Sequence, residues 1–137
     1  MDASNGKTID VINPANKVMI DTIPNSTLED VDIAVNEAVI GQKEWAKLPV
    51  HERGRILLKF AEYVKDDAEN LASLLSQETG KPIKEARAEI GQVQISVPAF
   101  VEQAKHLYGQ VIPAGTEIGQ DKTIQITERY PIGVVAA

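Results

Sequence analysis

Helical periodicity through the middle of the chain is the feature that most limits the fold. Four stretches between residues 26 and 108 carry apolar side chains three and four positions apart, as on one face of a helix. The clearest example lies in the second stretch, at Leu57, Phe60, Ala61 and Val64. Start and stop residues separate the stretches: Ser26 with Glu29, Pro49, Asp66 with Glu69, Gly80, Pro82 and Gly109. We therefore expect four helices over residues 26–108, the first opened by a capping box of Ser26 and Glu29.

Proline at position 98 lies inside the fourth helical stretch, which runs from Pro82 to Leu107. Proline lacks the backbone N–H and clashes with the preceding turn of a helix. The sequence therefore predicts a kink between Gln94 and Pro98.

Strand patterns lie on either side of the helices. Alternation with period two over Thr8–Ile12 and Val18–Ile23, around the turn residues Asn13–Lys17, predicts a hairpin over residues 8–23. Residues 122–129 also alternate, which predicts a strand with one solvated face. Residues 132–137 are apolar without alternation, as in a strand buried on both faces. Because such a strand needs neighbours and covering layers, we expect the chain to be the front part of something larger.

Composition excludes several classes of function. The 137 residues contain no cysteine and only two histidines, which rules out disulfides, thiolate zinc sites, a cysteine nucleophile and a multi-histidine metal site. With 14 basic and 20 acidic residues the net charge is −6, which argues against nucleic-acid or anionic membrane partners. The chain has no apolar run long enough for a bilayer and does not begin like a signal peptide. We expect a soluble, cytoplasmic protein.

Catalytic equipment is not visible in the sequence. His51 and His106 flank helix ends beside charged residues and are expected at the surface, because a general base needs a positioned partner. The glycines are scattered and form no phosphate-binding pattern. From the residues alone, the chain is a helix-rich α+β unit in which we assign no catalytic, cofactor-binding or metal-binding residue.

The order of its short motifs nevertheless resembles a known family. The motifs are Ile12–Ala15, Trp45 with Pro49, Glu52 and Arg53, Glu78–Pro82, Tyr108–Gly109 with Ile112–Pro113, and Pro131–Ala137. In this order they resemble the N-terminal portion of NAD(P)-dependent aldehyde dehydrogenases, over essentially the whole chain from about Thr8. The run Glu78–Pro82 is similar to that of the succinate-semialdehyde and lactaldehyde branch. Tyr130 departs from the pattern, since many relatives have an acid there.

The resemblance implies an α/β fold in which residues 1–137 are the incomplete N-terminal part of a Rossmann-like cofactor domain. On this match residues 122–129 are the oligomerisation strand, and residues 132–137 are the first strand of the parallel sheet. The residues assigned to oligomerisation are Thr123, Ile124, Gln125, Ile126 and Thr127. Self-association through this exposed strand region is therefore expected.

The implied activity belongs to a longer parent enzyme, which oxidises a small aldehyde to a carboxylic acid with NAD or NADP. The family's cysteine and glutamate, and its cofactor-phosphate loop, have no counterpart here. We therefore expect the chain alone to be inactive and to bind no cofactor. Gln92 would face the substrate tunnel on this match, although a solvated position on an amphipathic helix explains it equally well. The alternative for the whole chain is a stand-alone helical interaction module.

Overall fold

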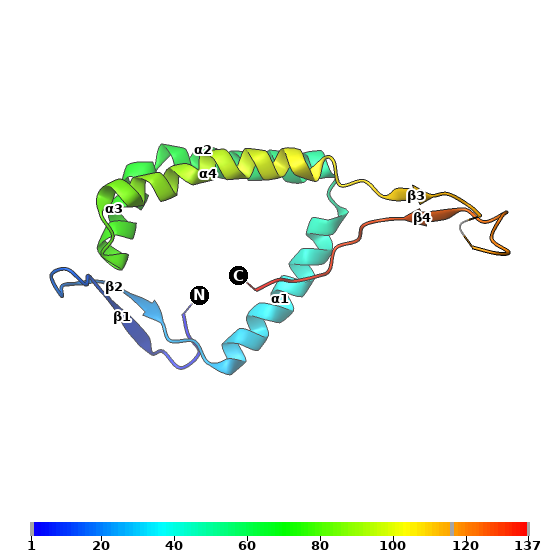
Figure 1. Ribbon diagram of the computed structural model, residues 1–137. Coiled ribbons are helices and arrows are strands. Elements are labelled where there is room, and N and C mark those ends of the chain that lie inside the picture. Colours follow the sequence, from blue (N-terminus) through cyan, green and yellow to red (C-terminus); the bar gives the residue numbers. More distant parts are fainter. Residues whose placement is uncertain (1, 116, 137) are drawn as a thin grey trace.

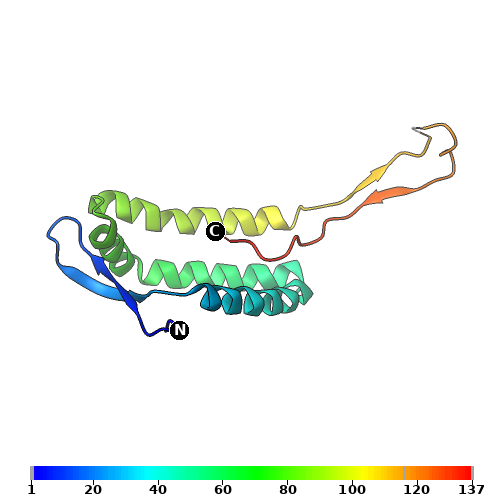
Figure 2. The same ribbon diagram turned by 90° about the horizontal axis from the view of Figure 1, so that it is seen from below.

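The computed structural model describes residues 2–115 and 117–136. Figure 1 shows an open frame rather than a layered domain, in which α2 and α4 lie side by side, α1 slants away from them, and a strand pair extends from the far end. Figure 2 shows the same frame from below, with the C-terminal segment returning past the end of α4. The four predicted helices form, and the strands pair in two separate antiparallel ladders.

The N-terminal hairpin agrees with the prediction. Strand β1 (Thr8–Ile12) pairs antiparallel with β2 (Met19–Pro24), with an irregularity in register after Val11. The turn is held by side chains: Asn13 Oδ1 accepts from the Ala15 N–H at 2.9 Å and Asn16 Oδ1 from the Val18 N–H at 3.0 Å. Both bonds are Asx turns, the local geometry for which asparagine is favoured in loops.

Helix α1 (Leu28–Lys47) begins with a capping box, but one residue later than predicted. The capping pair is Thr27 and Asp30, not Ser26 and Glu29. The Thr27 Oγ1 accepts from the Asp30 N–H at 3.2 Å, and Asp30 Oδ2 accepts from the Thr27 N–H at 2.8 Å. Asp30 also accepts from the Ser4 N–H, so the N-terminal segment is attached to this cap. This extra partner is one that a local sequence pattern cannot show.

Helices α2 (Val50–Asp66), α3 (Ala68–Thr79) and α4 (Ile83–Ala104) form the packed part of the molecule. Their buried contacts are made by small residues: Gly54, Ala61, Ala72, Ala86 and Val101. A Cβ added at Gly54 would lie 2.9 Å from Val101 Cγ1, so glycine permits the close approach of α2 and α4. Gly80 follows α3 with φ 76°, as predicted for a glycine that ends a helix.

Helix α4 is continuous from Ile83 to Ala104 and contains Pro98. It ends three residues before Leu107, because the chain turns at Lys105 and His106. The kink expected near Pro98 stays a prediction.

The second strand pair was only partly predicted. Strand β4 is limited to Gln125–Thr127, whereas the pattern predicts a strand over residues 122–129. It pairs antiparallel with β3 (Gln110–Ile112), which the sequence did not reveal. The predicted strand is shortened because β3 offers three partners, and Thr123 lies in a turn in which its N–H donates to Gln120 O at 3.1 Å.

The predicted strand over residues 132–137 is wrong for the part that the structure describes. Positions 132–136 carry no strand, and Ala137 lies outside the described residues. Ile132 is 93% exposed and Val135 is 68% exposed. The physical reason is that a strand needs hydrogen-bonded neighbours, and both described ladders lie elsewhere in the chain.

The molecule exposes far more surface than a compact protein of its mass. Its accessible surface is 11,035 Å², whereas a compact monomer of this mass exposes about 7,000 Å². No residue of α1 is buried, and its apolar side chains Val31, Val35 and Ile40 are exposed. None of the helices in the described part of the chain combines the length and the hydrophobicity of a membrane-spanning segment.

Candidate functional site

A groove of about 430 Å³ lies where the end of α1, the start of α2 and the end of α4 meet the chain that follows β4. Its lining is mostly apolar, with three aromatic and two arginine side chains. The lining residues are Trp45, Val50, Arg53, Gly54, Leu57, Phe100, Val101, Ala104, Leu107, Arg129, Tyr130 and Pro131. The groove therefore joins Trp45 and Arg53 of the second motif to Pro131 of the last, which are far apart in the sequence.

The groove has no acid–base pair that could perform catalysis. Its ionisable residues are Arg53, Arg129 and Tyr130, and the Tyr130 hydroxyl donates to Glu128 Oε2 at 2.5 Å. This hydrogen bond, followed by the charge of Glu128, raises the pKa of Tyr130 above its ordinary value. The hydroxyl of Tyr130 is therefore engaged with a neighbouring carboxylate and not with a partner in the groove. The groove lies between the helices and residues 129–131 of the chain that follows β4.

The predicted surface histidines lie at the ends of helices. His51 Nε2 lies 3.8 Å from Glu52 Oε1, and this carboxylate has a lowered pKa because it accepts from Arg55 at 2.8 Å. His106 is hydrogen-bonded to Tyr108 Oη at 2.8 Å and lies 3.3 Å from Glu102. All these side chains are substantially exposed. Among the described residues no group of three or more potential ligands could hold a metal ion.

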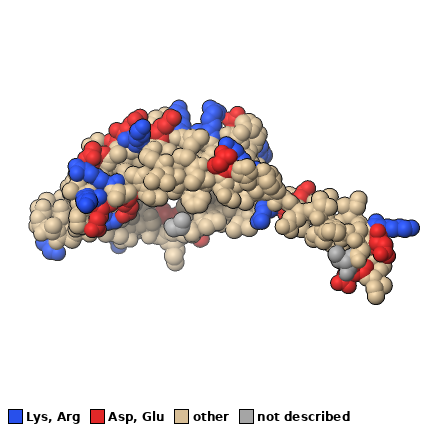
Figure 3. All heavy atoms as spheres, turned by 45° about the horizontal axis from the view of Figure 1, so that its top comes forward, with Lys and Arg blue, Asp and Glu red and all other residues tan. Residues whose placement is uncertain are grey.

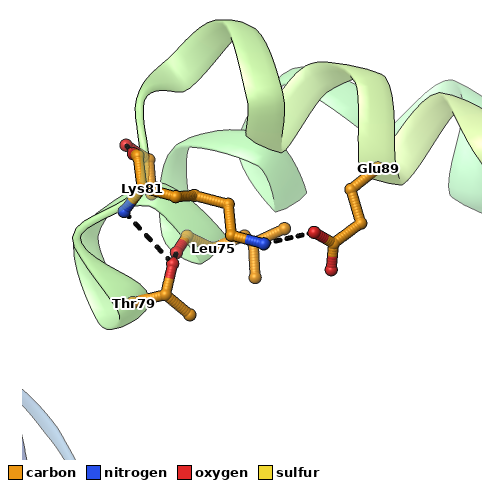
Figure 4. A network of polar contacts seen from close by, with 5 residues as sticks. Leu75, Thr79, Lys81 and Glu89 are labelled. Carbon is orange, nitrogen blue, oxygen red and sulfur yellow. Dashed lines mark hydrogen bonds and ion pairs between the residues drawn. The ribbon is translucent and has the colours of Figure 1, made fainter.

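The turn between α3 and α4 contains the third motif, Glu78–Pro82, and is held by several polar contacts, among them one from the Lys81 N–H to Thr79 Oγ1 at 3.4 Å. The Thr79 hydroxyl donates to Leu75 O at 2.6 Å, and the Ser76 hydroxyl donates to Lys81 O at 2.7 Å. The Lys81 ammonium reaches over the turn to the carboxylate of Glu89 on α4 (Figure 4). These contacts fix the direction in which α4 leaves the turn.

Gln92, the predicted tunnel residue, lies on the exposed side of α4. Its backbone carbonyl accepts a hydrogen bond from the Ser96 hydroxyl at 2.9 Å. Its neighbour Gln94 points the other way and donates from Nε2 to Ala61 O of α2 at 2.6 Å. Sequence reasoning missed Gln94, because its role depends on the partner helix and not on a local pattern.

Of the predicted oligomerisation residues, Gln125–Thr127 form β4 in the strand pair that extends from the helices, and Thr123 and Ile124 directly precede it (Figure 1). Ile124 is 81% exposed and Ile126 is 63% exposed. Within the described residues β4 pairs only with β3, so its second edge is open. Acidic and basic side chains are mixed over the helices on the face shown in Figure 3, and both kinds also lie at the far end of the strand pair that extends from the helices.

Comparison with known proteins places these features in one family. A model described as the aldehyde dehydrogenase family matches residues 1–137. The NADP(+) succinate-semialdehyde dehydrogenase GabD of Escherichia coli strain K12 is 34% identical over 137 residues, which are 100% of this chain and 28% of that protein. A glutarate-semialdehyde dehydrogenase of Pseudomonas putida is 36% identical over the same share of each chain.

Solved structures agree with this assignment. An aldehyde dehydrogenase from Brucella melitensis biovar abortus 2308 superposes with a TM-score of 0.81 at 34% identity, over 85% of this chain and 24% of that one. The chain thus spans about 28% of the length of the curated relatives named above. The match of the family model over the full sequence and the shared fold show that the chain belongs to the aldehyde dehydrogenase family.

Proposed function

We propose that the chain is the N-terminal scaffold of a cytoplasmic enzyme that oxidises a small aldehyde to a carboxylic acid with NAD or NADP. Membership of the family and the names of its relatives support this proposal. Two of those relatives are named for semialdehydes of dicarboxylic acids, which supports a substrate with a carboxylate at the end opposite the aldehyde.

The residues present do not form a site for the dinucleotide. Such sites form at the carboxyl ends of parallel strands and at a helix N-terminus. The described strands form two antiparallel pairs, and the sequence has no glycine-rich phosphate loop. No catalytic step is therefore assigned to this chain, and we expect it alone neither to oxidise aldehydes nor to bind NAD(P) with micromolar affinity.

The scaffold role rests above all on the surface that the chain leaves uncovered. About 4,000 Å² more is exposed than a compact protein of this mass would expose. The apolar side chains of α1 and of residues 132–136 contribute to this surface. We propose that the remaining part of the enzyme covers them.

A chimeric enzyme tests the proposal directly. This chain would replace the matching segment of the Escherichia coli relative, and NADP+ reduction with succinate semialdehyde would be compared with that of the relative lacking the segment. We expect reduction by the chimera only. A folded chimera that is no more active than the shortened relative would contradict the scaffold role.

We further propose that the chain associates with itself through residues 123–137, which contain β4 and the apolar segment that follows it. An open strand edge beside exposed apolar side chains is a template for pairing with another chain. Burying a side chain such as Ile126 is worth roughly 1.5–3 kcal/mol. Light scattering at ~100 µM, where exposed edges associate, should show dimers or larger species.

Matched variants locate the contact. Lysine at Ile126 and Val134 together should shift the population toward monomer, whereas Ile95→Lys, at an exposed apolar position on α4, should not. A clean monomer of the unmodified chain would refute association through this strand.

A further inference from the structure

One turn of α4 combines two features that weaken a helix. Pro98 has no N–H to donate to the carbonyl of Gln94, four residues earlier. The Ser96 hydroxyl donates to the carbonyl of Gln92 at 2.9 Å, a back-bond that commonly bends helices. Residues 92–98 are therefore the part of α4 whose direction is least determined by its own backbone.

The same turn is attached to α2 by a side chain. Gln94 Nε2 donates to the carbonyl of Ala61 at 2.6 Å, and Ala61 is only 4% exposed. A second close contact, Gly54 with Val101, lies seven residues away along each helix. Seven residues are about two helical turns, so both contacts fall on the same side of α4 and hold it at two points.

Gln92 lies within this turn, two residues before Gln94. Successive helical residues are about 100° apart, so Gln92 and Gln94 project in nearly opposite directions. A rotation of this turn about the α4 axis therefore displaces both side chains together. Fixing Gln94 against α2 also fixes Gln92 on the exposed side.

We infer that Gln94 is a positioning residue that fixes the orientation of Gln92 on the exposed side of α4 by clamping a weakened turn of α4 to α2. Its consequence for the enzyme rests on the proposed function and on the expectation, from the family resemblance, that Gln92 faces the substrate tunnel. The clamp itself concerns this chain alone.

Hydrogen exchange of the 137-residue chain tests the clamp. Gln94→Met keeps the size of the side chain and removes its donor, whereas Gln103→Met makes the same change at an exposed position of the same helix. Loss of one net hydrogen bond should speed exchange of the amides in residues 92–97 about three- to ten-fold. Gln103→Met should leave these rates unchanged, and equal rates in both variants would overturn the clamp.

Pro98→Ala provides a second test that does not depend on the stability of Gln94→Met. Alanine restores the donor to the Gln94 carbonyl, so exchange in the turn should slow. In the double variant Pro98→Ala/Gln94→Met the effect of losing the clamp should shrink, which a double-mutant cycle measures. Unchanged exchange in Pro98→Ala would show that the turn is not weakened.

Kinetics of the active chimera test the consequence for the enzyme. If Gln92 contacts bound substrate, Gln94→Met and Gln92→Met should both raise KM for the aldehyde several-fold with little change in kcat. Gln103→Met should leave both constants unchanged. A KM that rises for Gln92→Met but not for Gln94→Met overturns the positioning role of Gln94, and a KM unchanged in both variants contradicts the expected contact of Gln92 with substrate. An inactive chimera with normal exchange effects contradicts the proposed function but leaves the clamp standing.

Discussion

Pro14 packs directly against Gly80, so the turn of the N-terminal hairpin lies on the turn between α3 and α4. A Cβ added at Gly80 would lie 2.8 Å from Pro14 Cγ, and Gly80 has φ 76°. The contact joins two motifs that are 66 positions apart in the sequence. It explains why a small residue with a left-handed conformation is required at that point.

Gly80→Ala is expected to destabilise the chain through both effects. The left-handed conformation costs a non-glycine residue about 1–2 kcal/mol, and the new methyl group must also displace Pro14. Gly6→Ala is the matched control, because Gly6 has φ 66° but no atom within 4 Å of its added Cβ. Urea unfolding should show a larger loss for Gly80→Ala than for Gly6→Ala. Equal losses would show that the contact with Pro14 has no energetic weight.

A double-mutant cycle isolates the contact. Pro14→Ala should remove part of the cost of Gly80→Ala, because the shorter side chain leaves room for the added methyl group. Additive effects of the two substitutions would mean that the hairpin and the helical turn are not coupled.

Gly109→Ala is expected to separate β3 from β4. An added Cβ would lie 1.8 Å from the backbone oxygen of Thr127. Because the clash is with a backbone atom, no side-chain movement can relieve it. The backbone amides of Gln110 and Ile112 should lose their protection from hydrogen exchange. Gly41→Ala, inside α1 with open space around its added Cβ, should leave these amides protected; loss in both variants would contradict the explanation.

The start of α1 should depend on pH through Asp30. The backbone hydrogen bond from Thr27, as the largest cause, lowers the pKa of Asp30 below its ordinary value of 3.8. A carboxylate with a lowered pKa stabilises the fold above about pH 4, and this contribution is lost as the pH falls through its pKa in the folded protein. Asp30→Asn should therefore lower stability at pH 7 and remove this dependence.

Denaturation across this pH range measures the effect, with Asp32→Asn as the control on the same helix. The difference between Asp30→Asn and the unmodified chain should shrink toward zero in acid. A difference that stays constant with pH would exclude the charge of Asp30 as its source.

Sequence patterns predicted the elements that depend on residues close together in the chain. The hairpin over residues 8–23 and the four helices follow from apolar spacing and from turn and cap residues near in sequence. The cap of α1 was placed one residue too early because Asp30 gains Ser4 as a partner, 26 positions away. The β3 strand and the role of Gln94 were missed for the same reason, since each depends on a distant backbone group.

The strand expected at residues 132–137 did not form over its described positions, although its local sequence pattern is clear. Its apolar composition is that of a buried strand, but composition cannot supply the neighbours that a strand requires. The resemblance in the motifs indicated the family, and the comparisons confirm it. The candidate site residue Gln92 rests on that resemblance and stays a prediction.

The central claim is that this chain works as part of a longer aldehyde-oxidising enzyme. Its most direct test is to capture the native protein with an antibody against residues 26–108, and to measure NAD(P)+ reduction with a series of aldehydes alongside the intact mass. The account predicts reduction, strongest with a semialdehyde that bears a carboxylate, by a species several times heavier than 14.9 kDa. A captured species of 14.9 kDa that reduces neither cofactor would contradict it and would favour a stand-alone interaction module.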